Sequence, residues 1–245
     1  MIDPGKQVIV DIAIAAPMEV VWAAITDPAQ IATWFGWDAP SLADEIQFIF
    51  VDGSTSDPAT HRVQFGEWEG SSYAIELSAA GAQTRLRVLR SAPEPLDWAG
   101  TYDAIAEGWV TFFHQLKLAL EQHRGDTRRT IFLSGATRPG GEEPSIALGL
   151  ANATNRAVTA DYAAELGMGD RISGAVWYRS HFQTGLTVAQ WGNGLLAVTD
   201  MGVSPERPEG GGSVVLTTYG LGDSHFAALE QRWTDWWTER FAPKG

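Results

Sequence analysis

The sequence predicts an α+β protein in which one fold, an antiparallel sheet followed by a long helix, occurs twice. The length of 245 residues suits two domains. Two similar strings, Gly-Glu-Trp-Glu-Gly around Trp68 and Ala-Gln-Trp-Gly-Asn-Gly around Trp191, lie roughly 125 residues apart, and a strand-like apolar run follows each. An aromatic-rich amphipathic segment closes each half, at 102–123 and 224–241. Together these features indicate a tandem duplication, with domains at 1–124 and 128–245.

In the first half, alternating apolar residues over 8–15 predict a strand. Pro17 opens a short helix that ends at Asp27-Pro28, and a second short helix follows at 29–34. The next segments predict four strands, because apolar residues alternate with polar ones between turn residues: 45–51, 61–68, 71–78 and 83–90. One apolar and one polar face on these strands indicate a sheet with one side in water. A long helix is expected at 102–123.

The second half is less regular. A strand is predicted at 130–135, a loop at 138–144 and a helix at 159–166. Further strands are expected from their apolar runs, at 174–179, 186–191, 195–199 and 213–219. The closing helix carries Phe226, Leu229, Trp233, Trp236 and Trp237 on one side, with Ser224 as the expected N-cap.

Composition excludes several classes of function. The net charge is −13 with three lysines and no basic stripe, so we expect no nucleic-acid partner. The absence of cysteine excludes disulfides and thiolate sites. No apolar run is long enough to cross a membrane and no signal peptide is visible, so a cytoplasmic protein without a membrane partner is expected. The sequence does not determine the oligomeric state.

The order of elements and several local strings resemble the START/Bet v1-like (SRPBCC) superfamily. The opening Ala16–Pro28 and Trp34–Gly36 look closest to the branch similar to the C-terminal domain of the Hsp90 ATPase activator. The segments Gly81–Leu86, Glu107–Trp109 and Leu116–Glu121 resemble the late strand and closing helix of that branch. The resemblance covers residues 6–123; for 128–245 it is carried by element order and the final helix. It implies a helix-grip fold in two copies, in each of which a sheet wraps around the closing helix.

This resemblance also implies a cavity between the long helix and the concave face of the sheet. Its lining would consist of the inward aromatic and aliphatic residues of the first half: Phe48, Phe50, His61, Val63, Phe65, Tyr73, Ile75, Trp109, Phe112, Phe113 and Leu116. Trp34, Phe35 and Trp37 would lie near its mouth. The same aromatic residues could equally form a solid core, and both interpretations remain open at this point.

The sequence shows no catalytic motif. It lacks a His-Glu-x-x-His string and a Gly-x-Ser-x-Gly elbow, so no metal, no cofactor and no catalytic residue is predicted. His61 is either a polar point in the cavity or a strand-end residue at its rim. His114 lies off the apolar stripe of its helix and is expected at the surface. Carboxylates such as Asp44 and Asp103 are interpreted as solvating charge.

These features favour a binding protein for a large apolar or aromatic small molecule over a conventional enzyme. The resemblance implies a role in bacterial natural-product biosynthesis, polyketide or enediyne, or in self-resistance by sequestration. A self-sacrificing form would need a glycine near a reactive ligand, and the sequence does not single out one of its 26 glycines. The alternatives are a polyketide cyclase/aromatase, which would use polar groups such as His61, Tyr73 or Tyr102, and a chaperone-associated interaction domain.

Overall fold

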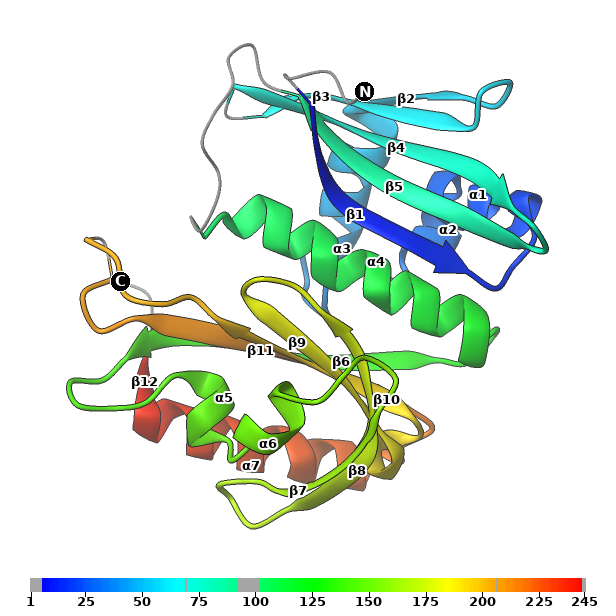
Figure 1. Cartoon of the computed structure of the whole chain (residues 1–245). Coiled ribbons are helices and arrows are strands. Elements are labelled where there is room, and N and C mark those ends of the chain that lie inside the picture. Colours follow the sequence, from blue (N-terminus) through cyan, green and yellow to red (C-terminus); the bar gives the residue numbers. More distant parts are fainter. Residues whose placement is uncertain (1–5, 69, 92–101, 206, 244–245) are drawn as a thin grey trace. The chain divides into compact units, whose positions relative to one another are not determined.

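The computed structural model describes residues 6–68, 70–91, 102–205 and 207–243. The chain divides into two compact units, unit 1 (Met1–Gly125) and unit 2 (Asp126–Gly245). Each unit contains one antiparallel sheet and one long closing helix (Figure 1). The predicted α+β helix-grip fold in two copies is therefore confirmed.

Unit 1 has a five-stranded sheet in the order β1-β5-β4-β3-β2. Its strands are β1 (Lys6–Ile14), β2 (Ser54–Asp57), β3 (Arg62–Trp68), β4 (Ser71–Ala80) and β5 (Gln83–Ser91). Its helices are α1 (Met18–Thr26), α2 (Pro28–Ile31), α3 (Leu42–Ile46), the π-helix η1 (Gln47–Asp52) and α4 (Ala104–Gln122). Figure 1 shows α4 running along one face of this sheet.

The two faces of the unit 1 sheet differ as the alternation predicts. On β5, the residues Leu86 and Val88 are fully buried, whereas Arg85 and Arg87 point to the other face. Both arginines bond to Asp11 of β1 across that outer face. The hydrogen bond from Arg85, with a smaller one from Arg87, lowers the pKa of Asp11 below its usual range. The outer face is therefore a polar surface and the inner face is the core side.

The predicted strand at 45–51 is wrong, because this segment is helical. It forms the end of α3 and the six-residue π-helix η1. Phe50 points inward and is 8% exposed, whereas Phe48 is 63% exposed. The same residues fit two periods, since Ile46, Phe48 and Phe50 alternate while Leu42, Ile46 and Phe50 recur every four residues. The helical spacing is the one that packs against the unit 1 core.

Unit 2 has a seven-stranded sheet in the order β12-β6-β11-β10-β9-β8-β7. Its strands are β6 (Arg128–Thr137), β7 (Asp161–Glu165), β8 (Arg171–Arg179), β9 (Gln183–Val188), β10 (Gly194–Asp200), β11 (Gly211–Tyr219) and β12 (Phe241–Ala242). Its helices are α5 (Pro144–Ala147), α6 (Ala151–Thr154), the 3-10 turn η2 (Ala189–Trp191) and α7 (Asp223–Arg240). The core of unit 2 lies between the sheet and α7, where the aromatic side chains of α7 meet the aliphatic side chains of the strands.

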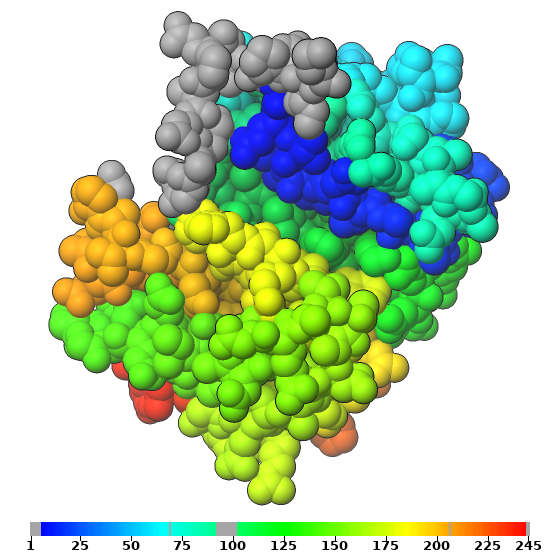
Figure 2. Space-filling model, viewed as in Figure 1, coloured from blue at the N-terminus to red at the C-terminus, as the bar shows by residue number. Residues whose placement is uncertain are grey.

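The predicted helix at 159–166 is wrong, because residues 161–165 form the edge strand β7. Its alanines favour a helix, but Tyr162 and Leu166 are buried and the segment pairs with β8. Sheet pairing outweighs local propensity here. The β7–β8 turn lies at the molecular surface (Figure 2). Helix α7 begins at Asp223 with Gly222 as its N-cap, so Ser224 is not the cap.

The two tryptophan-centred strings occupy corresponding hairpins. Counted back from the closing helix, the β3–β4 connection of unit 1 corresponds to the β9–β10 connection of unit 2. Trp68 ends β3 and is 38% exposed, whereas Trp191 ends η2 and is 5% exposed. The strings therefore mark equivalent turns, although only one of the two indoles joins a core.

Candidate ligand site

An aromatic cluster lies between α4 and the inner face of the unit 1 sheet. Trp109 of α4 lies at its centre, with ring centroids 5.3 Å from Phe65, 6.2 Å from Tyr73 and 6.2 Å from Phe50. It also stacks on Phe113, one turn further along α4, at 5.6 Å. The central indole therefore contacts the sheet, the π-helix and its own helix at once.

Trp34 and Phe35 extend this cluster from the segment after α2. The ring of Trp34 lies 5.3 Å from Phe113, and that of Phe35 lies 4.9 Å from Phe50. Trp34 Nε1 donates to the carbonyl of Ala24 at 2.8 Å, so its polar atom is satisfied within the fold. Gln115 of α4, fully buried, donates to the carbonyl of Trp34 at 3.2 Å and holds this segment against the helix.

Most of the residues that the sequence placed around the cavity come together in this region. The buried members are Trp34, Phe35, Phe50, Val63, Phe65, Tyr73, Ile75, Trp109, Phe113 and Leu116. Phe112 and Trp37 are half-buried at the edge of the cluster, where their rings lie 6.0 Å apart. Trp34 was expected near the mouth but is 1% exposed and central.

Two of the expected residues lie elsewhere. Phe48 points outward from η1 and its ring contacts that of Trp68 at the surface, at 6.2 Å. His61 lies in the turn before β3 with a φ of +50°, so the strand alternation does not extend to it. Its half-buried ring lies edge-on to Trp22, at 5.5 Å. The structure thus favours the rim position for His61 over a place inside the cluster.

A buried ionic group at the end of the inner face was missed from the sequence. Arg90 is 5% exposed, and its Nε donates to Ser71 Oγ at 3.0 Å. Its guanidinium pairs with Asp103 and lies 5.6 Å from the centre of the Tyr73 ring. The signal was present, since Thr84, Leu86, Val88 and Arg90 share one parity on β5. Asp103 is therefore a structural partner, not a solvating charge.

One polar atom inside the cluster lacks a partner. The indole Nε1 of Trp109 is inaccessible to solvent and has no hydrogen-bond partner among the described residues. The side chain is 3% exposed and its indole ring is surrounded by other aromatic rings. A buried donor without a hydrogen-bond partner lowers the free energy of unfolding by about 1–3 kcal/mol, so native proteins contain few such donors.

His114 of α4 was expected at the surface but is half-buried. Burial, with the positive charge of Lys117 in addition, lowers the pKa of His114 to about 3. The imidazole is therefore neutral at physiological pH and is not a general acid in this state.

The described residues form neither a metal site nor a membrane-spanning helix. No group of three or more His, Cys, Asp or Glu side chains within residues 6–68, 70–91, 102–205 and 207–243 is placed to hold a metal ion. Across the same part of the chain, no helix is long and apolar enough to cross a lipid bilayer.

Several solved structures are similar to this chain. DynU16, from the dynemicin biosynthetic locus, is 18% identical, with 96% of this chain and 95% of that chain covered and a TM-score of 0.34. The di-domain ARO/CYC BexL of the BE-7585A biosynthetic pathway is 12% identical, with 98% and 99% covered and a TM-score of 0.37. The Aha1 dimer from Colwellia psychrerythraea is 20% identical, with 49% and 98% covered and a TM-score of 0.34.

No family model matches the sequence, and no curated protein matches it either. The fold assignment accordingly stands on the strand order and closing helix of each unit described above.

Proposed function

We propose that unit 1 binds a flat, largely apolar aromatic molecule between α4 and the inner face of its sheet. The observation that carries the proposal is the unpartnered Nε1 of Trp109 at the centre of the aromatic cluster. A ligand with a carbonyl or phenolic oxygen would accept this hydrogen bond, while its ring system would stack among the surrounding side chains.

The aromatic character of the cluster supports a flat ligand. Seven rings contribute to it, and each contacts at least one other within 6.4 Å. Aromatic pairs gain from offset and edge-to-face contacts, and these contacts are equally available to a ring brought by a ligand. Trp34 Nε1 already donates a hydrogen bond within the fold, whereas Trp109 Nε1 does not. Trp109 is therefore the residue that we expect to donate to the ligand.

The experiment is a titration of the full chain with quinizarin, a dihydroxyanthraquinone, followed by tryptophan fluorescence and calorimetry. Trp109→Phe keeps an aromatic ring but removes the donor, and it should weaken binding to unit 1 by about tenfold. The matched control is Trp22→Phe, since Trp22 is a half-buried tryptophan whose ring contacts His61 outside the cluster.

Unchanged affinity in Trp109→Phe would contradict the proposal, as would an equal loss in the Trp22→Phe control. Absence of quinizarin binding to the wild-type chain would also overturn it for this class of ligand.

The biological role that we propose is natural-product biosynthesis or self-resistance by sequestration, and it derives from the sequence resemblance of residues 6–123. A polyketide cyclase is the second candidate, favoured by the Arg90 guanidinium beside the Tyr73 ring at the end of the same face. Product formation from a poly-β-ketone, lost in Tyr73→Phe but retained in His61→Ala, would favour the cyclase and place its acid/base group at Tyr73.

A further inference from the structure

Arginines of this chain repeatedly combine two contacts, one with an aromatic ring and one with a carboxylate. The guanidinium of Arg129 lies 3.8 Å from the centre of the Phe226 ring. The same guanidinium donates to Asp223 Oδ1 at 2.8 Å. The aromatic ring attracts the cation through its π face, and the carboxylate pairs with the guanidinium N–H groups.

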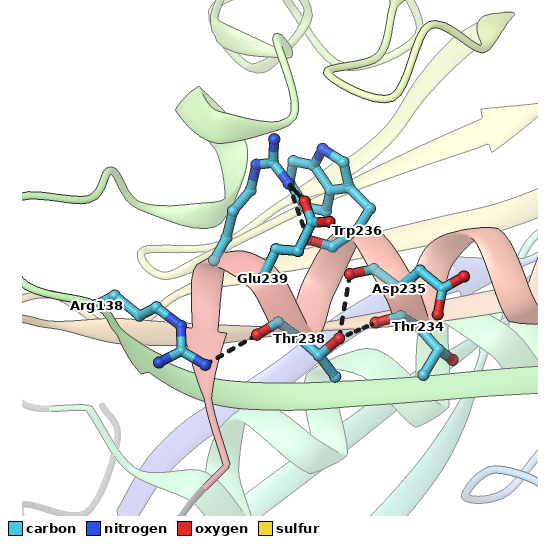
Figure 3. A network of polar contacts seen from close by, with 7 residues as sticks. Arg138, Thr234, Asp235, Trp236, Thr238 and Glu239 are labelled. Atoms are coloured by element: carbon cyan, nitrogen blue, oxygen red, sulfur yellow. Dashed lines mark hydrogen bonds and ion pairs between the residues drawn. The ribbon is translucent and has the colours of Figure 1, made fainter.

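The end of α7 shows the same arrangement, within the polar network of Figure 3. The guanidinium of Arg240 lies 4.5 Å from the centre of the Trp236 ring, and its Nη1 is 3.1 Å from Glu239 Oε2. The buried ionic group around Arg90 in unit 1 is a third example. In this chain, an arginine therefore completes an aromatic ring that has a carboxylate beside it in three separate places.

One surface of unit 1 has exposed aromatic rings that no such arginine covers. Among the described residues of unit 1, the exposed large apolar side chains are Phe48, Val51 and Trp68, at 63%, 43% and 38%. The rings of Phe48 and Trp68 contact each other edge-on, 6.2 Å apart. We call these three residues the η1 patch. No arginine or lysine of the described part of the chain lies over either ring.

The fold holds the η1 patch in a fixed arrangement. The N–H of Gly66 donates to the carbonyl of Gly53 at 2.9 Å, which joins the end of η1 to β3. Ser54 Oγ donates to the carbonyl of Phe50 at 2.6 Å. A Cβ on Gly53 would lie only 2.6 Å from the Phe48 carbonyl, so glycine is needed where η1 ends. The exposure of Phe48 is therefore built into the π-helix, a conformation that is frequent at functional sites.

Carboxylates lie on both sides of Phe48 along the helix. Asp44 precedes it by one turn and Asp52 follows it by about one turn, and both side chains are exposed. Asp52 Oδ1 accepts from Gln47 Nε2 at 2.9 Å, which leaves its second oxygen for another donor. The segment 35–61 contains five aspartates and glutamates but no lysine or arginine. The η1 patch thus has the rings and the carboxylates, but not the arginine.

This charge favours one kind of occupant. The chain carries a net charge of −13, so a second copy would bring a surface of the same sign, and an anionic lipid surface would also be repelled. A basic segment would instead be attracted to the carboxylates, and its apolar side chains could cover the exposed rings.

We propose that the η1 patch docks an arginine-bearing, basic amphipathic segment of a partner protein. An arginine of that segment lies over the Phe48 or Trp68 ring and pairs with Asp44 or Asp52, while an apolar side chain covers Val51. The patch lies outside the aromatic cluster, so this interaction is separate from the small-molecule site proposed for unit 1.

The test uses the full chain and a fluorescein-labelled synthetic peptide of leucine and arginine, with helical spacing of the leucines, followed by fluorescence anisotropy. The same peptide with lysine in place of arginine should bind about threefold more weakly, because an ammonium stacks less well on an aromatic ring. The peptide with glutamate in place of arginine should not bind.

Variants of the chain locate the binding surface. Phe48→Ser and Asp44→Asn should each weaken binding of the arginine peptide by about fivefold. Their matched controls lie in unit 2, where Val203 is 75% exposed and Asp161 is exposed, so Val203→Ser and Asp161→Asn should leave the affinity unchanged. Phe48→Ser should also leave quinizarin binding unchanged, which keeps the two proposals distinguishable.

Four outcomes would overturn the proposal. The first is no binding of the arginine peptide to the wild-type chain, and the second is equal affinity in wild type and Phe48→Ser. The third is an equal loss in the Val203→Ser control. The fourth is self-association in sedimentation, or binding to phosphatidylserine vesicles, that Phe48→Ser abolishes, since either result assigns the η1 patch to a different occupant.

Discussion

At the scale of the residue, some buried polar atoms have a hydrogen-bond partner within the fold and others have none among the described residues. Thr84 and Thr137 are both buried strand threonines, 1% and 5% exposed. The hydroxyl of Thr84 donates to the carbonyl of Ala16 at 2.8 Å, whereas that of Thr137 has no partner among the described residues. Replacing each threonine with valine therefore makes the same chemical change once with and once without the loss of a hydrogen bond.

We predict that Thr84→Val destabilises the protein by about 1–3 kcal/mol, because it leaves the Ala16 carbonyl without its donor. Thr137→Val should be neutral or stabilising by about 1 kcal/mol, because it replaces an unpaired hydroxyl with a methyl group. Urea unfolding of both variants measures the difference. A loss in Thr137→Val as large as that in Thr84→Val would show that the Thr137 hydroxyl has a partner and would contradict the prediction.

At the scale of the element, the start of α4 depends on Asp103. Its Oδ1 accepts hydrogen bonds from the backbone N–H groups of Ile105 and Ala106, at 2.9 and 3.1 Å. The same carboxylate pairs with Arg90, so the N-cap of the helix is also the counter-ion of a buried strand arginine. One side chain thus joins α4 to β5.

We predict that Asp103→Ala lowers the stability of unit 1 by about 3 kcal/mol, since it removes the cap and leaves Arg90 without this carboxylate. Asp103→Asn keeps an oxygen for the cap but loses the charge, so its cost should be smaller. Guanidinium unfolding, with hydrogen exchange of the first turn of α4, measures both effects. Equal stability of Asp103→Ala and wild type would show that the ion pair contributes nothing.

Short apolar segments were the elements that the sequence could not assign. Residues 45–51 and 159–166 fit both a period of two and a helical spacing over a few residues. In each case the contact with a distant segment determines the secondary structure. The π-helix η1 places Phe50 in the aromatic cluster, and β7 hydrogen-bonds to β8. The long helix α4 and the strands β4 and β5 have enough residues to show their period, and they were predicted correctly.

At the scale of the whole molecule, one contribution to the pH dependence of stability comes from His114, whose pKa is lowered by folding. The folded-state pKa of His114 is about 3, below the value of about 6.5 expected in the unfolded chain. Between these two pKa values the unfolded chain binds a proton at His114 that the folded protein does not bind. The contribution of His114 to the free energy of unfolding is therefore unreduced above about pH 6.5 and falls as the pH decreases.

We predict that stability decreases by at most about 1.4 kcal/mol per pH unit from this residue as the pH falls from 6.5 to 5. His114→Gln should flatten the decrease, whereas His181→Gln, at an exposed position, serves as the control for losing one histidine. An NMR titration of the His114 ring tests the cause directly. An inflection near pH 6.5 in the folded protein would contradict the prediction.

The sequence by itself determined the duplication, the long strands and closing helices, and most of the apolar residues of the candidate site in unit 1. These features are encoded locally, in the period of long strands and helices and in the turn residues between them. Strand alternation already defines the inward face of β3 and β4, and the apolar stripe of the long helix defines the other side. The residues buried there for these two reasons are Val63, Phe65, Tyr73, Ile75, Trp109, Phe113 and Leu116.

Only the tertiary structure decided which buried polar atoms are satisfied. The sequence does not distinguish Trp34 from Trp109, but Trp34 Nε1 donates to the carbonyl of Ala24, whereas Trp109 Nε1 has no hydrogen-bond partner among the described residues. Likewise, Arg90 and Asp103 become partners only when β5 and α4 are brought together. A hydrogen bond or ion pair needs both atoms within about 3 Å in a favourable direction, and that geometry is set by the packing of segments distant in sequence.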